Sequence, residues 1–265
     1  MKVEYIDHMG SDLRIVNTAR VSFKKQSDWE YFTTRHTDRF NLIYDLTEKR
    51  LSKADTSLIH YLARGMSAKE REKIIQEALD ADTKETLMSC FDRMNAETHW
   101  APFAHTCVQM HFTAPIFVAR QLGKHQVGLV WSEVSRRYVD TPPEFYNPPE
   151  FRYRADNVKQ GSSQQGTGWG LSMYNAAVKK CIEVYNDLLE GNIAPEQARM
   201  VLPQSMMTEW VWTGSMLAFH RVYRLRSDAH AQKETQEIAK QIAAIIEPLF
   251  PVSWAALTGR THDEI

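Results

Sequence analysis

The strongest constraint on the fold is an alternation of apolar and polar residues over positions 106–113. Val108, Met110 and Phe112 occupy every second position, with a glutamine and a histidine between them. Successive side chains of a strand point to opposite faces, so this alternation predicts a strand with one face buried. Any fold of this chain must therefore pack at least one sheet face against a core.

Helical spacing of apolar residues dominates the rest of the chain. Asp55 can cap a helix over residues 55–64, which Gly65 can end. Pro115 suits the first turn of a helix over residues 116–122. The other expected helices cover residues 16–21, two amphipathic segments within 67–95 with a hinge near 80–82, and residues 173–190, 195 onward, 207–225 and 228–246.

Two further regions complete the expected architecture. Residues 2–7 are predicted to form a short strand, and the Pro- and Gly-rich residues 141–170, with embedded aromatics, a long ordered loop or flap. The chain has 265 residues, of which 43% are hydrophobic, which is enough for a sizeable core. We predict a single α/β (α+β) domain over residues 1–265, with a modest central sheet surrounded by helices.

Charge and cysteine content argue against several classes of protein. The chain carries 32 Lys+Arg and 33 Asp+Glu, whereas a nucleic-acid coat needs a basic surplus. Three cysteines without a C-x-x-C motif argue against a disulfide framework or a zinc ribbon. The first residues show no signal-peptide pattern, and no window approaches the ~18 apolar residues of a membrane span. These features predict a protein of the reducing cytoplasm.

Residues 120–138 contain the densest polar cluster. It holds four cations, one histidine, one glutamate and two serines. Arginine suits bidentate recognition of phosphate, and serine hydroxyls with backbone N–H groups can complete an anion site. From the residues alone, a phosphate site and a structural network of salt bridges are equally compatible with this cluster.

A second cationic segment covers residues 221–232. Arg226 follows a leucine and precedes Asp228 and His230. An arginine beside apolar residues can turn inward, where its planar fork can bind the polar edge of a pyrimidine. The alternative, which this segment taken alone favours, is a helix capped by Asp228 with Arg224 and Arg226 on a solvated face.

Several common sites are not indicated. His99, His105 and His111 lack the i, i+4 spacing of a helical zinc site, so we predict no metal. The chain has no G-x-S-x-G elbow of the hydrolases. It also has neither a P-loop nor a G-x-G-x-x-G motif, so the common nucleotide-binding folds are not expected.

The polar cluster contains two short motifs, Lys-His-Gln at 124–126 and Ser-Arg-Arg-Tyr at 135–138. They resemble the signature of the flavin-dependent thymidylate synthases, the ThyX family, which reads R-H-R, a short gap and S-x-R-Y. Further blocks resemble the family in the same order, at residues 19–23, 99–105, 114–121, 199–203 and 225–232. The resemblance spans most of the chain.

The chain departs from the family pattern mainly at the flavin positions. Lys124 and Gln126 stand where the family usually has arginine, and Ser132 where it has asparagine. The other departures are one extra residue in the gap, Ala101 for threonine, and Ser215, Leu217 and Arg221 where Asn, Arg and Asn are frequent. With residues 67–95 as a helical insertion, the pattern resembles the divergent, phage-type branch.

The resemblance implies a ThyX-like fold and a reaction. The family methylates C5 of dUMP with a methylene group from methylenetetrahydrofolate and reducing equivalents from NADPH through FAD, without an enzyme cysteine nucleophile. Its members are homotetramers whose sites combine several subunits. We therefore expect an FAD-binding nucleotide enzyme in the cytoplasm, the host's if the chain is phage-encoded, without nucleic-acid or membrane partners.

The resemblance also implies roles for individual residues. Arg226 would be catalytic, because a fixed cation facing the pyrimidine favours its N3-deprotonated form. The residues expected to bind the nucleotide are Gln121, Glu133, Ser135, Arg136, Arg137, Arg199 and Arg226. Those expected to bind FAD are Ser22, His99, Lys124, His125, Gln126, Val127, Ser132, Glu133, Ser215, Arg221 and His230.

Three alternatives stay open. Lys124 and Gln126 could accompany a changed pyrimidine such as dCMP, methylated or hydroxymethylated, although an N3 anion suits uracil. A homologue that binds nucleotide but has lost catalysis would share every block. A nucleic-acid-binding module would use the arginine clusters with Trp131 and Tyr138 as stacking groups, against the near-neutral charge.

Overall fold

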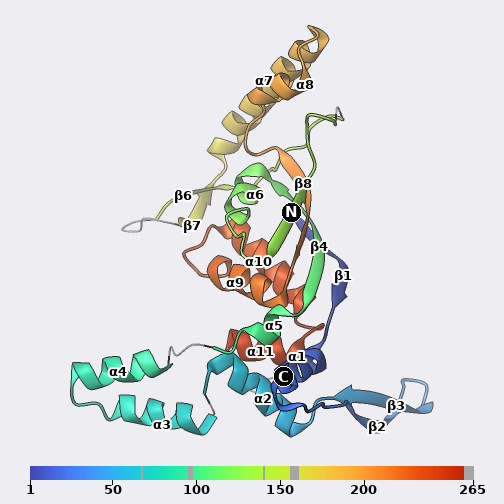
Figure 1. Cartoon of the computed structure of the whole chain (residues 1–265). Coiled ribbons are helices and arrows are strands. Elements are labelled where there is room, and N and C mark those ends of the chain that lie inside the picture. Colours follow the sequence, from blue (N-terminus) through green and yellow to red (C-terminus); the bar gives the residue numbers. More distant parts are fainter. Residues whose placement is uncertain (67, 95–97, 140, 156–160, 260–265) are drawn as a thin grey trace. The chain divides into compact units, whose positions relative to one another are not determined.

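The computed structural model describes residues 1–66, 68–94, 98–139, 141–155 and 161–259, and combines helices with strands (Figure 1). The strands are β1 (Lys2–Met9), β2 (Glu30–Thr37), β3 (Ile43–Arg50), β4 (Cys107–Pro115), β5 (Leu129–Glu133), β6 (Phe151–Arg154), β7 (Ser162–Thr167) and β8 (Met207–Gly214). The helices are α1 (Asp12–Arg20), α2 (Lys53–Arg64), α3 (Ala68–Leu79), α4 (Lys84–Met94), α5 (Ala101–Ala104), α6 (Ile116–Leu122), α7 (Trp169–Glu190), α8 (Pro195–Ala198), α9 (Met216–Arg226), α10 (Lys233–Ile246) and α11 (Pro251–Thr258), with 3-10 turns η1 (Val21–Phe23) and η2 (Arg199–Val201). The predicted mixed fold class is confirmed.

Contacts divide the chain into two compact units, each assembled from separate stretches of sequence. The first unit comprises Met1–Asp7, Val108–Gly214 and Arg221–Ile245. The second comprises His8–Cys107, Ser215–His220 and the stretch from Ile246 onward. The organisation as one catalytic domain stays a prediction.

The first unit is built on a four-stranded sheet in the order β1-β4-β8-β5. β4 runs antiparallel to β8, with Val108 opposite Gly214 and Pro115 opposite Met207. Every second residue of β4, from Val108 to Ala114, is fully buried. The two strands predicted at residues 2–7 and 106–113 are therefore confirmed.

The prediction of one helix over residues 207–225 is wrong. The first part of this segment is strand β8, and α9 begins only at Met216. Thr208, Trp210 and Trp212 are buried while their neighbours along β8 are partly or fully exposed. Tryptophan, valine and threonine favour a pleated surface with one buried face, and β8 pairs with strands on both sides. These cross-strand contacts outweigh any helical spacing in the segment.

Four aromatic side chains pack on the sheet. Trp210 lies between Phe112, at 5.0 Å between ring centroids, and Trp131, at 4.4 Å, both nearly parallel to it. Trp131 also meets the edge of Trp212 at 5.3 Å. Trp131 belongs to β5, whose position in the sheet the sequence analysis did not indicate. This packing fixes the strand that ends in Glu133.

The expected loop over residues 141–170 contains a small sheet. β6 and β7 pair antiparallel, with Phe151 opposite Thr167. Arg152 of β6 donates to the carboxylate of Glu234 at 2.7 Å, and both side chains are largely buried. Part of this region, residues 156–160, lies outside the described residues. The prediction of a loop is thus wrong for β6 and β7.

The second unit is mainly helical. α2 contacts both α1 and α11, and the buried core includes Ile15, Ile59 and Trp254. The carboxylate of Asp12 accepts two backbone N–H groups from the first turn of α11, each at 3.0 Å. This buried side chain therefore caps a helix far away in the sequence.

Several expectations for the second unit can be compared with the structure. α2 is capped by Ser52 and not by Asp55, because the Ser52 hydroxyl accepts the Asp55 N–H at 3.1 Å. Gly65 ends α2 in the left-handed conformation, as predicted. The expected helix pair is confirmed as α3 and α4, with a small core of Met66, Ile74 and Cys90. Of the range expected for it, residues 67 and 95 lie outside the described part.

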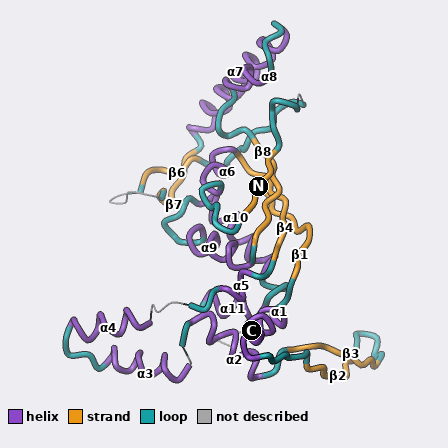
Figure 2. Tube along the Cα trace, viewed as in Figure 1, coloured by secondary structure: helices purple, strands orange, loops and turns teal. Residues whose placement is uncertain are grey.

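The antiparallel hairpin of β2 and β3 has no counterpart in the sequence analysis (Figure 2). Nearly all of its side chains are exposed, so no apolar alternation marks it. The helices expected at residues 16–21, 116–122, 173–190 and 195 onward are confirmed as α1, α6, α7 and α8 within a few residues. The helix expected from residue 228 begins only at Lys233.

Candidate functional site

Arg226, at the end of α9, contacts the loop that follows α6. Its Nε donates to Nε2 of His125 at 3.0 Å, and its Nη2 donates to the backbone carbonyl of Gln121 at 3.3 Å. The side chain is partly buried, and this burial lowers the pKa of the guanidinium, which stays charged at any physiological pH. The alternative of Arg226 on a solvated helix face is therefore wrong, whereas Arg224 is exposed.

His125 accepts the Arg226 hydrogen bond, so its Nε2 must be unprotonated. Burial, and then the charge of Arg226, lower the pKa of His125 below its ordinary value. The neutral imidazole thus holds the guanidinium in place. The contact joins two motifs 101 residues apart in the sequence.

Gln121 and Arg226 line a cavity of about 600 Å³ in the first unit. Other lining residues that carry polar groups are Arg152, Ser162, Arg224, Asp228, His230 and Gln232. The side-chain oxygen of Gln121 is buried and accepts no hydrogen bond from the part of the chain that the structure describes. The cavity therefore brings three arginines and one carboxylate together with amide and hydroxyl groups.

A second cavity, of about 420 Å³, is lined by the Lys-His-Gln motif. Lys124 and Gln126 are exposed at its mouth, and Trp131 and Trp212 supply aromatic surface. Glu133 lines it as well. The cavity therefore combines a cation, an amide and aromatic walls.

Glu133 is held in place by two neighbours that the sequence analysis did not place in the nucleotide or FAD site. The Thr208 hydroxyl donates to one of its carboxylate oxygens at 2.7 Å, and the Trp131 indole N–H donates to the other at 3.2 Å. Thr208 is buried in β8. Had residues 207–214 been recognised as a strand, Thr208 would have been a candidate, because it shares a face with the two tryptophans of β8.

A third cavity, of about 680 Å³, is lined by Glu133, Arg136 and Arg199. The guanidinium of Arg136 donates to the carbonyl of Thr141, and Nε of Arg199 donates to the carbonyl of Glu196 at 3.3 Å. Both cations are thus oriented by the backbone and keep N–H groups that can bind an anion. Arg136 and Arg199 therefore make structural hydrogen bonds and still have N–H groups available for a ligand.

The turn that carries this cluster is fixed by Ser135. Its hydroxyl accepts the N–H of Arg137 at 3.3 Å, and its carbonyl accepts the N–H of Tyr138 at 3.0 Å. The Arg137 guanidinium pairs with Glu196 at 3.4 Å, between two exposed side chains. Ser135 and Arg137 therefore make structural contacts in this structure.

The second unit carries three of the expected FAD residues. Ser22 is exposed in η1, and the His99 ring stacks on Tyr61 with centroids 5.5 Å apart. The Ser215 hydroxyl accepts the N–H of Ala218 at 3.1 Å and caps α9. Ser22 and His99 are both exposed, whereas the Ser215 hydroxyl is engaged by the helix that it caps.

The remaining expected residues lie in the first unit and are exposed. They are Val127, Ser132, Arg221 and His230. The His230 imidazole contacts the carboxylate of Asp228 at 3.1 Å, and Asp228 also accepts the backbone N–H of His230. Asp228 therefore stabilises a turn before α10 and does not cap the helix.

Within the described residues, no three His, Cys, Asp or Glu side chains are grouped to hold a metal ion. None of the described helices is long and apolar enough to cross a membrane.

We expect stability to decrease as the pH falls below about 6.5, the ordinary pKa of histidine. Because the folded-state pKa of His125 is lowered, the unfolded chain takes up its proton first, and unfolding is favoured as the pH falls toward the folded-state value. As the pH falls through this range, the urea concentration at the unfolding midpoint should decrease less for His125→Gln than for the wild type. The glutamine amide oxygen can accept the hydrogen bond from Arg226 and does not titrate. The exposed His36, replaced in the same way, is the control. Identical profiles for the wild type and His125→Gln would contradict this.

Comparison with known proteins gives the family. The profile of a family described as "Thymidylate synthase complementing protein" matches residues 4–252. A flavin-dependent thymidylate synthase of Thermosipho africanus is 36% identical over 162 residues, 60% of this chain and 71% of the relative. One of Thermus thermophilus is 29% identical over 255 residues, 96% of this chain and 74% of the relative.

A solved structure supports the fold. The crystal structure of a UMP/dUMP methylase from Streptomyces cacaoi bound with 5-Br dUMP gives a TM-score of 0.68 at 24% sequence identity, over 98% of this chain and 95% of that one. At this identity the likeness concerns the fold alone. The family profile, together with the two relatives, shows that this chain belongs to the flavin-dependent thymidylate synthase family.

Proposed function

We propose that this enzyme methylates C5 of dUMP, with methylenetetrahydrofolate as carbon donor, NADPH as reductant and FAD as cofactor. The names of its relatives, flavin-dependent thymidylate synthase, support the flavin and the reaction class. The observation that carries the proposal is the contact of Arg226 with His125 and Gln121, which joins the cationic end of α9 to the signature motif.

Arg226 is suited to activate a uracil ring. C5 becomes nucleophilic when electron density enters the ring, and loss of the N3 proton supplies it. A fixed, partly buried cation stabilises the resulting anion more than water does. Cytosine has no N3 proton to lose, so Arg226 favours dUMP over dCMP. Gln121 lines the same cavity as Arg226.

The second cavity fits a flavin. Lys124 offers a cation for a phosphate, Gln126 an amide for a ring edge, and Trp131 an aromatic surface. FAD bound there and reduced by NADPH would supply the hydride that converts the transferred methylene group to methyl. Among the described residues that line the three cavities, no cysteine occurs, in agreement with a reaction without a cysteine nucleophile.

The nucleotide residues line separate cavities of the first unit. Gln121 and Arg226 line one, and Glu133, Arg136 and Arg199 line another. This separation supports an active site completed by other copies of the chain, as in a homotetramer. Sedimentation analysis at the assay concentration tests for the tetramer. An active monomer would contradict a site completed by other copies of the chain.

The visible spectrum of the protein with FAD, before and after addition of dUMP, tests the proposal. A bound-flavin spectrum that shifts with dUMP supports a shared site, and dTMP formation with NADPH oxidation supports the reaction. A shift without turnover would instead support a nucleotide-binding homologue that has lost catalysis. Faster turnover of dCMP than of dUMP in competition would overturn the assignment of the substrate.

A further inference from the structure

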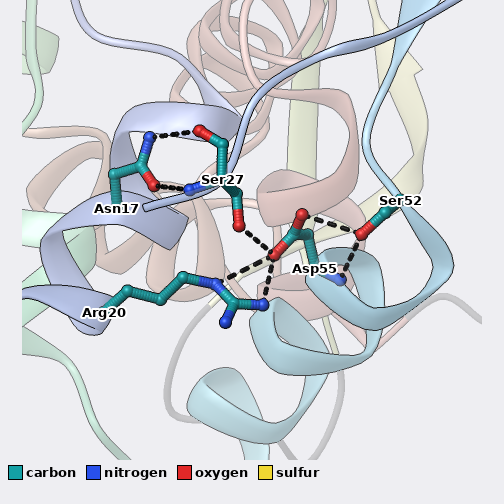
Figure 3. A network of polar contacts seen from close by, with 5 residues as sticks. All are labelled: Asn17, Arg20, Ser27, Ser52 and Asp55. Carbon is teal, nitrogen blue, oxygen red and sulfur yellow. Dashed lines mark hydrogen bonds and ion pairs between the residues drawn. The ribbon is translucent and has the colours of Figure 1, made fainter. Parts of the chain in front are cut away.

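A buried carboxylate in the second unit joins two helices and a loop (Figure 3). Oδ1 of Asp55 accepts Nε and Nη2 of Arg20, at 3.1 and 2.6 Å, and the Ser27 hydroxyl at 2.8 Å. Oδ2 accepts the Ser52 hydroxyl at 2.7 Å. Asp55 is only 3% exposed, so these bonds replace its hydration.

A second pair of bonds fixes the backbone at Ser27. Its N–H donates to Oδ1 of Asn17 at 2.7 Å, and its carbonyl accepts Nδ2 of Asn17 at 3.0 Å (Figure 3). Asn17 and Arg20 both belong to α1, and Asp55 lies in the first turn of α2. The chain between Arg20 and Ser27 is therefore tied at both ends to the same two helices.

The tied segment, residues 21–26, is called here the Ser22 loop. It displays Val21 at 69% and Phe23 at 74% exposure, with exposed Ser22 and two exposed lysines beside them. Lys24 adopts a left-handed conformation, at φ 51°. Such a conformation persists where the surrounding structure fixes it, and the network at the two ends of the loop does so.

The composition of the Ser22 loop matches one kind of ligand. Two exposed apolar side chains offer contact area, one hydroxyl offers a hydrogen bond, and Lys24 and Lys25 offer positive charge. A rigid loop binds more tightly than a mobile one, because its ordering cost is already met in the free protein. A dinucleotide with an aromatic ring and phosphate groups would use all three features.

We propose that Asp55 is a positioning residue that holds the Ser22 loop in the conformation that binds FAD. This rests on the proposed function, with FAD as cofactor, and on the expectation from the family resemblance that Ser22 contacts it. Asp55 itself reaches the cofactor only through Arg20 and Ser27. The hydrogen bond from the Ser27 hydroxyl to Asp55 fixes the end of the loop. The hydrogen bond from the Ser52 hydroxyl to Asp55 instead stabilises the start of α2.

The network works throughout the physiological pH range. Burial by itself raises the pKa of Asp55, but the hydrogen bonds from Ser52, Ser27 and Arg20 outweigh it, and the pKa lies below its ordinary value. The carboxylate is therefore charged wherever the enzyme works. The hydrogen bonds that this carboxylate accepts therefore do not depend on pH within this range.

The test compares two substitutions, each of which removes one serine hydroxyl that donates to the Asp55 carboxylate. Ser27→Ala should weaken FAD binding about fivefold to tenfold, since a hydrogen bond to a charged group is lost and the loop is freed. Ser52→Ala is the matched control and should lower the melting temperature while leaving the Kd of FAD within about twofold. Ser27→Thr keeps the hydroxyl and should restore binding.

Three measurements separate positioning from a general loss of structure. They are the Kd of FAD from flavin fluorescence, the Kd of dUMP, and the hydrogen exchange of amides in the Ser22 loop, all on the full-length protein. Ser27→Ala should raise the Kd of FAD and the loop exchange while the Kd of dUMP stays constant.

Other outcomes would overturn the proposal. Equal losses of FAD affinity in Ser27→Ala and Ser52→Ala would show that general stability, and not the loop, decides binding. Unchanged FAD affinity in Ser27→Ala would remove the role of Asp55 and leave the proposed function intact. A wild-type protein that binds no FAD would overturn both.

Discussion

Replacement of Arg226 by alanine is expected to lower kcat/KM for dUMP by about 10²- to 10³-fold, the usual effect of removing a group that stabilises developing charge. The guanidinium is held by His125 and Gln121, so no reorganisation is needed when charge develops on the pyrimidine. Initial rates of dTMP formation at saturating FAD, NADPH and methylenetetrahydrofolate measure the effect.

Two further variants test whether this loss of kcat/KM is specific to the guanidinium of Arg226. Arg226→Lys keeps the charge but not the planar fork, so its rate should lie between those of the wild type and Arg226→Ala. Lys233→Ala removes an exposed cation at the start of α10, seven residues further on, and should stay within about twofold of the wild type, as for a cation that is solvated. A rate for Arg226→Ala close to that of Lys233→Ala would exclude a catalytic role of Arg226.

The parts of the fold that could be predicted are those whose burial is periodic. β4 alternates between buried and partly buried residues, and α1, α2, α6 and α7 show the expected helical spacing. β8 was predicted as a helix because the helical pattern of α9 follows it without a proline. Its identity as a strand depends on β4 and β5, which lie far away in the sequence. The β2–β3 hairpin exposes nearly all of its side chains, so no apolar alternation marks it, and it is held by backbone pairing and by exposed cross-strand contacts such as that of Arg35 with Asp45.

The candidate site could be predicted as a set of residues but not as an arrangement. The cations of residues 120–138 and Arg226 were selected by type and by resemblance to the family. The contact of Arg226 with His125 depends on the tertiary fold, as does the bond from Thr208 to Glu133. Asp55 shows the same limit, because its sequence position predicts a helix cap, whereas its carboxylate joins α1, α2 and the Ser22 loop.

The second large effect concerns stability, at the centre of the sheet. Trp210→Ala should lower the free energy of unfolding by about 3–5 kcal/mol, the range for a buried aromatic replaced by alanine. The indole is 1% exposed and lies between Phe112 and Trp131, so its removal leaves a cavity between two rings. Urea unfolding at constant m-value measures this change.

Trp210→Phe is the matched control for this prediction. The indole N–H of Trp210 is buried without a hydrogen-bond partner among the described residues, so phenylalanine removes volume but none of the hydrogen bonds that the structure describes. It keeps a flat ring between Phe112 and Trp131, and should cost at least about 2 kcal/mol less than alanine. Equal costs for the two variants would mean that a flat ring between Phe112 and Trp131 does not account for the stability of β8, and with it of the strand that carries Glu133.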